Sequence, residues 1–312
     1  MKKTLVAALI LLTVFLAACS NREHNNTEPN NLKITQGSNN VVNLQGEIDS
    51  NEIKNDNTNE WEAINTEGNN IISRINTPSD FTREEASKGS FSEFVRNYPL
   101  KDNGSPVLLY NSSEKRNQNS HIAVFDMPLV EGDLQQCADS IMRMYAEYYY
   151  SQKLFDKIGF HFVNGFLCDF KNWSDGYRVD INGNETAWVK KAEYSDSIET
   201  FEQYLRMVFS YSSTLSMEKE SEPQSINELK IGDVFLKSGS PGHVVMVVDV
   251  CKNDEGEKAF LLAQGYMPAQ EFHILKNPEH DNDPWYYEKE VRFPLATPEY
   301  TFGEESLRRL LY

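Results

Sequence analysis

Hydrophobic and polar positions divide this chain of 312 residues into three stretches. An apolar run over residues 5–16 follows two lysines, and a polar stretch with 15 asparagines among 51 residues covers 20–70. From Ile71 onward, short apolar runs alternate with Gly and Pro. The polar stretch cannot bury enough apolar area to offset the entropy of ordering it. We therefore expect a leader over 1–18, a disordered, flexible tether over 19–70 and one folded domain over 71–312.

The pattern within the folded domain predicts helices first and an antiparallel sheet afterwards, which is an α+β class. Ser90, followed three positions later by Glu93, is a capping box, and Asp133 with Gln136 reads as the start of a long helix. The expected helices cover 90–98, 133–153, 197–211 and 304–311. The expected strands cover 107–110, 121–126, 177–181, 186–189, 234–236, 243–250, 259–263 and 271–275.

The apolar run of the leader is too short for an ordinary transmembrane helix, and it ends in Leu16-Ala17-Ala18-Cys19. This segment resembles the bacterial lipoprotein signal. The resemblance implies cleavage before Cys19 and attachment of fatty acyl chains such as palmitate to it, which would tether the protein to a membrane. Ser20 in the next position favours sorting to the outer membrane. A plain secretory signal with a cysteine at its cleavage site is the alternative.

Charge excludes one class of partner. The chain has 30 Lys and Arg against 47 Asp and Glu, for a net charge of −17. Cleavage of the leader removes two lysines, so that 28 basic residues face 47 acidic ones and the net charge becomes −19. Binding to nucleic acid needs a concentrated cationic face. We therefore expect no nucleic-acid partner.

One histidine stands where it can carry chemistry. His243 follows a Gly-Ser-Pro-Gly turn and opens a long apolar strand, a position from which its ring can face a cleft. Upstream, Cys137 lies in the first turn of the expected helix, where backbone N–H groups favour a thiolate. Gln264 ends the following strand and can orient the imidazole ring.

This order of residues resembles the central part of NlpC-type, papain-like cysteine hydrolases, in which a helix packs on an antiparallel sheet. The resemblance implies that Cys137 is the nucleophile, His243 the base and Gln264 the orienting residue. Asp249, at the far end of the same strand, is a poorer orienter. The family's Asp-Cys-Ser-Gly signature is absent, and Glu131 occupies the spacing of the papain-like oxyanion glutamine. Gln135 or Gln136 would have to substitute for it.

A structural interpretation competes with this one. Cys137 begins an apolar stripe that continues through Ile141, Tyr145 and Tyr148, so it fits a helix face turned to the core. His243 fits a satisfied polar residue at the end of a sheet. Cys168 and Cys251 read as packing thiols, and a disulfide among the three cysteines beyond the leader is open.

Metal binding is the other chemistry to weigh. A loop that contains His280 with Glu279, Asp281 and Asp283 follows His273. The spacing of the two histidines does not place both on one face of a helix or opposite each other on paired strands, as one tetrahedral metal site would require. We read the loop as a solvated turn and expect no metal and no cofactor.

Seven aromatic residues lie in or near the elements expected to form the cleft, and they can either pack in the core or stack on sugar rings: Trp173, Tyr177, Trp188, Tyr266, Trp285, Tyr286 and Tyr287.

A wider resemblance covers nearly all of residues 71–312. The segments 90–94, 133–139, 239–245 and 261–271, with 284–286 and 297–299, resemble a family of Bacteroidetes envelope lipoproteins, the domain of unknown function family 4846. This resemblance implies no particular activity, because none is assigned to the family.

The sequence thus supports two functions. The first is a lipid-anchored hydrolase, an amidase or peptidase acting on cell-wall peptide. The alternative is a non-catalytic envelope lipoprotein that binds peptidoglycan, another glycan or a protein partner.

Overall fold

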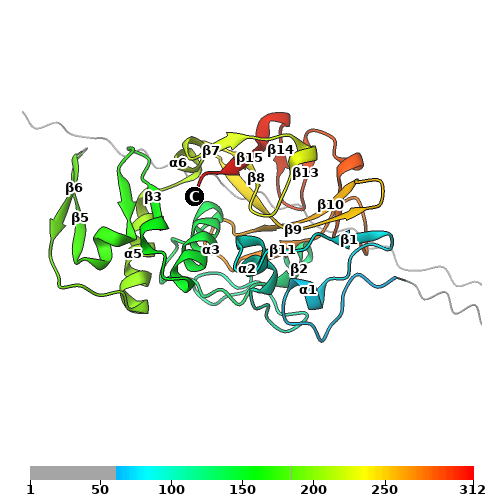
Figure 1. Cartoon of the computed structure of the whole chain (residues 1–312), viewed down its shortest axis with the longest axis horizontal. Coiled ribbons are helices and arrows are strands. Elements are labelled where there is room, and N and C mark those ends of the chain that lie inside the picture. Colours follow the sequence, from blue (N-terminus) through cyan, green and yellow to red (C-terminus); the bar gives the residue numbers. More distant parts are fainter. Residues whose placement is uncertain (1–60, 184) are drawn as a thin grey trace, which may run out of the picture. The chain divides into compact units, whose positions relative to one another are not determined.

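An antiparallel sheet of nine strands organises the computed structural model, which describes residues 61–312 except Asn184 (Figure 1). The α+β class with a dominant antiparallel sheet is confirmed. Seven strands lie in the order β2 (His121–Val124), β11 (His273–Leu275), β10 (Lys258–Gln264), β9 (His243–Asn253), β8 (Val234–Lys237), β15 (Leu307–Leu310) and β7 (Ser221–Pro223). Two further strands join them, β1 (Phe81–Arg83) on β9 and β12 (Tyr286–Tyr287) on β10. The leader, Cys19 and tether residues 19–60 lie outside the described residues.

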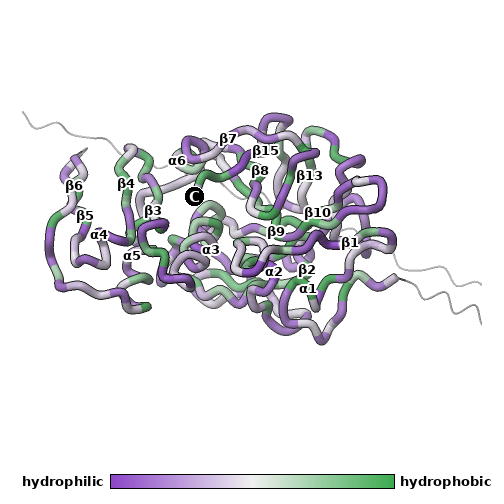
Figure 2. The backbone as a smooth tube through the Cα atoms, in the orientation of Figure 1, coloured by the Kyte–Doolittle hydropathy of each residue, from purple (hydrophilic) through white to green (hydrophobic). Residues whose placement is uncertain are grey.

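Strand β9 runs through the interior of the sheet and is mostly hydrophobic (Figure 2). Residues 243–251 are all buried. Its side chains alternate between two apolar clusters, as the period of a strand requires. Val244 and Met246 belong to the larger cluster, which includes the helices, whereas Val245 and Val247 belong to the smaller one. Both faces of β9 are therefore covered, which explains its long run of apolar residues.

Helices cover one side of this strand. The helices α2 (Phe91–Asn97) and α3 (Cys137–Ser151) both contact β9, and α5 (Ile198–Tyr211) packs on α3 (Figure 1). The short strands β13 (Leu295–Ala296) and β14 (Thr301–Phe302) supply Leu295 and Phe302 to the smaller cluster. Among the helices of residues 61–312, none has the length and apolar character that crossing a bilayer requires.

The remaining elements are short. They are α1 (Ile71–Arg74), α4 (Phe170–Ser174), α6 (Thr214–Lys219), β3 (Gly159–His161), β4 (Leu167–Asp169), β5 (Tyr177–Asn182) and β6 (Glu185–Lys190). The pairs β3–β4 and β5–β6 form two-stranded sheets of their own.

Several predicted elements are confirmed. Ser90 caps α2 by accepting the backbone N–H of Glu93, and Ser197 caps α5 in the same way from Thr200. The predicted hairpin is the pair β5–β6, and the predicted strands after residue 230 are β8, β9, β10 and β11.

Three predicted elements are wrong in kind or extent. The long helix begins at Cys137, because the side chain of Asp133 accepts the backbone N–H of Ala269 at 2.6 Å instead of capping the helix. Residues 107–110 form only isolated bridges from Leu108 and Leu109. Residues 304–311, predicted as a helix, are a 3-10 turn followed by β15, because pairing with β8 and β7 outweighs local helical spacing.

The fold also includes ten residues that the sequence assigns to the tether. The indole Nε1 of Trp61 donates to the carbonyl oxygen of Thr77 at 2.7 Å, Ala63 is buried, and Ile64 bridges to Ile75. Residues 61–70 are therefore packed against the domain rather than part of a free tether.

An ion cluster anchors the middle of β9. Asp249 is fully buried, and its two carboxylate oxygens accept from Arg96 Nε at 2.7 Å and Arg83 Nε at 2.6 Å. The cluster links α2 and β1 to the central strand. It also places Asp249 away from His243, as an anchoring residue rather than an orienting one.

We expect Asp249→Ala to lower the free energy of unfolding by about 3–5 kcal/mol, because it leaves the buried guanidinium of Arg96 without its counter-ion. Denaturant unfolding measures the change. The matched control is Asp254→Ala, which alters an exposed carboxylate at the end of the same hairpin. A loss below about 1 kcal/mol, the range of an exposed ion pair, would contradict the assignment.

Candidate active site

The predicted nucleophile lies where α3 meets the start of β9. Cys137 is the first residue of α3, and its side chain is only 7% exposed. The backbone N–H groups of Ala138, Val244 and Cys137 itself act to lower the pKa of this thiol. Val244 directly follows His243, so the thiol lies near the start of the strand that His243 opens. The side chain of Val244 belongs to the helix-side cluster with Cys137, whereas the ring of His243 packs on Phe302 of the smaller cluster.

His243 and Gln264 meet across two neighbouring strands. His243 opens β9 and Gln264 closes β10, so antiparallel pairing brings these ends together. The ring Nε2 of His243 lies 2.8 Å from Oε1 of Gln264. The structure therefore joins His243 to Gln264 by a hydrogen bond and places Cys137 against the residue that follows the histidine.

The approach of β10 to α3 depends on a glycine. A Cβ atom at Gly265 would lie 2.7 Å from Ser140 Oγ and 2.8 Å from the carbonyl oxygen of Gln136. Only a residue without a side chain lets the strand end pass this close to the first turn of the helix.

Aromatic rings enclose the imidazole. The ring centroid of His243 lies 4.6 Å from that of Tyr266, 4.9 Å from that of Tyr300 and 5.9 Å from that of Phe302. The hydroxyl of Tyr300 donates to the carbonyl oxygen of Pro241 at 3.3 Å, which ties two covering loops together. His243 is consequently only 2% exposed.

Burial sets the protonation of both groups. It raises the pKa of the Cys137 thiol to about 12, and the nearby carboxyl of Asp139 acts in the same direction, while three backbone N–H groups, those of Ala138, Val244 and Cys137, partly oppose it. Burial lowers the pKa of His243 to about 4. At neutral pH the enclosed pair is thus an uncharged thiol and an uncharged imidazole.

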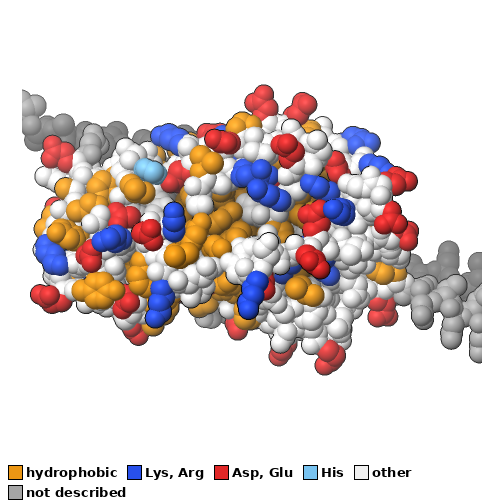
Figure 3. All heavy atoms as spheres, in the orientation of Figure 1, with side chains coloured by type: hydrophobic (Ala, Val, Ile, Leu, Met, Phe, Trp, Pro, Cys, Tyr) orange, Lys and Arg blue, Asp and Glu red, His pale blue; other side chains and the backbone are white. Residues whose placement is uncertain are grey.

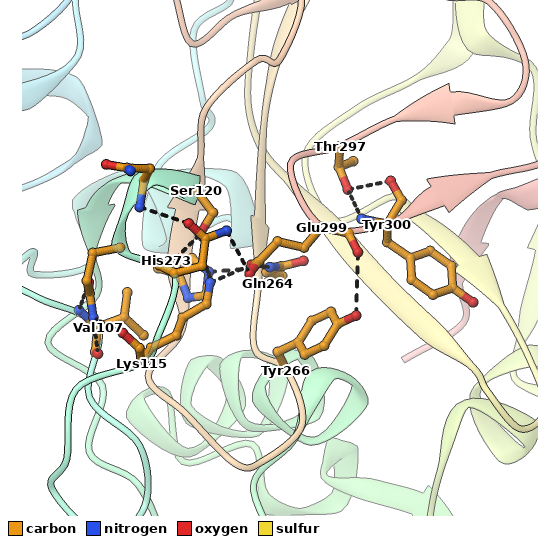
Figure 4. A network of polar contacts seen from close by, with 12 residues as sticks. Val107, Lys115, Ser120, Gln264, Tyr266, His273, Thr297, Glu299 and Tyr300 are labelled. Carbon is orange, nitrogen blue, oxygen red and sulfur yellow. Dashed lines mark hydrogen bonds and ion pairs between the residues drawn. The ribbon is translucent and has the colours of Figure 1, made fainter. Parts of the chain in front are cut away.

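A polar network lies behind Gln264 (Figure 4). Its amide Nε2 donates to Glu299 Oε2 at 2.8 Å, and Glu299 forms an ion pair with the buried Lys115. His273 lies on the same network. Sequence reasoning missed the roles of Glu299 and Lys115. The only signal was the segment Thr297-Pro298-Glu299 within the wider family resemblance, and nothing singled out Lys115.

The oxyanion candidates do not reach the thiol. Glu131 is exposed and pairs with Arg206 at 2.8 Å. Gln135 is buried and accepts from Arg143 Nη1 at 3.1 Å, and Gln136 reaches Asp133 at 3.4 Å. Backbone N–H groups at the start of α3 and β9 are instead the donors that lower the pKa of the thiol.

The other histidines and cysteines considered in the sequence do not contact the imidazole of His243. His273 is fully buried in the network, whereas His280 pairs with Glu290 at 2.7 Å on a separate loop. Within residues 61–312, no three or more His, Cys, Asp or Glu side chains are grouped so that they could hold a metal ion. Cys137, Cys168 and Cys251 are all buried free thiols.

A groove lies elsewhere on the domain, away from Cys137 and His243. It has a volume of about 600 Å³, lies between α2, α3 and α5, and is lined by Phe94, Tyr148, Tyr150 and Phe201 among others. Figure 3 shows hydrophobic side chains gathered over α3 among interspersed acidic and basic ones. Neither Cys137 nor His243 lines this groove.

The raised pKa of Cys137 predicts that the wild-type protein contains no thiolate at this position near neutral pH, because an acid whose pKa is raised keeps its proton. The ultraviolet absorbance of thiolate, measured as the difference between wild type and Cys137→Ala, should stay flat from about pH 5 to about pH 9. A thiolate signal with a midpoint near neutral pH would show instead that the pair rests as a thiolate and an imidazolium.

Comparison with known proteins adds one result. No curated protein and no solved structure matches this chain. The family model described as Domain of unknown function (4846) matches residues 71–309. This span contains Cys137, His243, Gln264 and Glu299, together with nearly the whole described fold. The chain therefore belongs to the family Domain of unknown function (4846).

Proposed function

We propose that this protein is a lipid-anchored envelope protein whose domain acts as a papain-like cysteine hydrolase on an amide or related acyl bond in cell-wall peptide. One observation carries the proposal. His243 opens β9 with its ring held by Gln264 at 2.8 Å, and the backbone N–H of the next residue, Val244, acts to lower the pKa of the Cys137 thiol.

The chemistry follows from which nitrogen is free. Nε2 of His243 is occupied by Gln264, so Nδ1 is the nitrogen left to accept the proton of the Cys137 thiol. The sulfur then attacks the substrate carbonyl, and the imidazolium returns the proton to the departing amine, leaving a thioester. Attack by water, with His243 again as base, releases the acid and regenerates the thiol.

Backbone donors support this role. The N–H groups of Ala138 and Val244 act to lower the pKa of the thiol, and such fixed donors stabilise negative charge as it develops. Their position at the first turn of a 15-residue helix adds the favourable end of its dipole.

The enclosed site requires an opening step. Tyr266 and Tyr300 flank the imidazole, and Tyr300 is held to Pro241 by one hydrogen bond. Moving the turn that carries Tyr300 away from the loop 239–242 would expose His243 without disturbing the sheet. Many enzymes gate their chemistry by loop motions of this kind.

A binding function is the second candidate, and the groove between α2, α3 and α5 favours it. Its volume of about 600 Å³ lies within the range of sites for small ligands, and five aromatic side chains line it. In that case the domain would hold a glycan or a protein partner, and the enclosed Cys137 would be a packing residue.

We expect purified wild-type protein to release fragments from cell-wall peptide, and Cys137→Ala and His243→Ala to abolish the release, because they remove the nucleophile and its base. Alkylation of Cys137 by iodoacetamide, followed by peptide mass mapping, should fall about 10²-fold or more in His243→Ala.

Cys251→Ala is the matched control, since it removes another buried free thiol at the far end of β9 and should leave the release intact. Absence of release, together with Cys137 labelling that is indifferent to His243, would favour the binding function instead.

The location has its own test. Growth with an alkyne-bearing fatty acid should label the protein, and Cys19→Ala should remove the label, because the acyl chains attach to that residue. Ser20→Ala, which leaves the cysteine in place, should keep it. A labelled Cys19→Ala variant would contradict lipidation at Cys19.

A further inference from the structure

We propose that Glu299, held by Lys115 and assisted by His273, acts as a positioning residue that fixes the amide of Gln264 in one orientation and thereby the proton of His243 on Nε2. The role of the remaining nitrogen, Nδ1, as a base rests on the proposed hydrolase function. The inference that the proton lies on Nε2 does not depend on that function.

The argument begins with what each neighbour of Gln264 can do. A carboxylate oxygen only accepts hydrogen bonds, so Glu299 Oε2, at 2.8 Å, must face the NH₂ group of the amide (Figure 4). The oxygen of the amide is then directed to His243 Nε2, also at 2.8 Å. An oxygen has no proton to give, and so His243 must donate.

His273 selects the same orientation. Its Nδ1 lies 2.8 Å from the carbonyl oxygen of Glu271, and a carbonyl only accepts, so Nδ1 carries the proton. Its Nε2 therefore has a bare lone pair, which faces the NH₂ group of Gln264 at 3.4 Å. Burial lowers the pKa of His273, which keeps the ring neutral and this lone pair available.

Lys115 holds the acceptor in place. Its ammonium donates to Ser120 Oγ at 2.7 Å, forms the ion pair with Glu299 and lies 3.5 Å from the bare nitrogen of His273. A cation supplies only donors, so it stabilises Glu299 as a carboxylate. Lys115 is buried, and removing Glu299 would leave its charge without a partner.

A reversed amide would meet two repulsions. Its oxygen would face the carboxylate of Glu299 and the lone pair of His273, and its NH₂ group would face His243. The network therefore excludes the arrangement in which Nε2 of His243 accepts and Nδ1 bears the proton. With the proton on Nε2, the lone pair of Nδ1 is free to act as the base.

The test is to read the tautomer of His243 in Glu299→Gln. Nitrogen NMR of the full-length protein distinguishes a protonated ring nitrogen from a bare one, and the His243→Ala spectrum assigns the signals. We expect the wild type to show the proton on Nε2 alone. In Glu299→Gln, whose new amide can donate or accept, we expect the ratio of the two tautomers to fall about tenfold, the factor that roughly one hydrogen bond of ordinary strength supplies.

Glu304→Gln is the matched control, because it makes the same chemical change on an exposed side chain and should leave the ratio unchanged. Lys115→Met combined with Glu299→Gln removes both charges together, so the tautomer ratio can be measured in this double variant if Glu299→Gln alone does not fold. A wild-type proton on Nδ1, or an unchanged ratio in a folded variant, would overturn the inference.

Failure of the proposed function looks different. Cys137 labelling that does not depend on His243 would end the hydrolase proposal, while a tautomer that responds to Glu299 would still establish the positioning role. If the base is Nδ1, Cys137 labelling should fall in parallel with the tautomer ratio in Glu299→Gln.

Discussion

Burial of β9 on both faces is the constraint on which the rest of the structure depends. A strand covered by helices on one side and by β13 and β14 on the other has no solvent-facing row, so its polar residues must find partners inside the protein. His243 is satisfied at its start by Gln264, and Asp249 further along by two arginines. The same covering brings the first turn of α3 against the strand and places Cys137 beside Val244.

The buried carboxylate of Asp249 and the partly buried one of Glu299 therefore have different consequences. Asp249 is held by cations from β1 and the end of α2, so its ion pairs fix the packing of elements. Glu299 has a single cation and also accepts from a neutral amide, so part of its hydrogen-bonding capacity fixes the orientation of another side chain. The charge of Glu299, close to the imidazole, thus orients a side chain, whereas the charge of Asp249, further along β9, holds β1 and α2 against the strand.

Sequence reasoning singled out His243 and Gln264, which the structure joins by a hydrogen bond, but not the residues around them. Cys137, His243 and Gln264 follow from local signals, namely a helix start, a turn before an apolar strand and the end of the next strand. Glu299 lies 35 residues beyond Gln264 in a turn without periodicity, so only the folded chain shows that it contacts the amide. Residues 307–310 were misread for a related reason. The spacing of Leu307 and Leu310 fits a helix locally, but pairing with β8 and β7 decides the outcome.

The enclosure of the three cysteines has a consequence for oxidative damage. Oxidants react with thiolates, and burial raises the pKa of Cys137 and of Cys251 to about 12, and that of Cys168 above its usual range as well. A protein with free thiols in an oxidising compartment would otherwise collect sulfenic acids and mixed disulfides. Here Cys137 is only 7% exposed, and Cys168 and Cys251 are fully buried. Oxidation of any of the three therefore requires the fold to open locally, so the rate of that oxidation would record how often it opens.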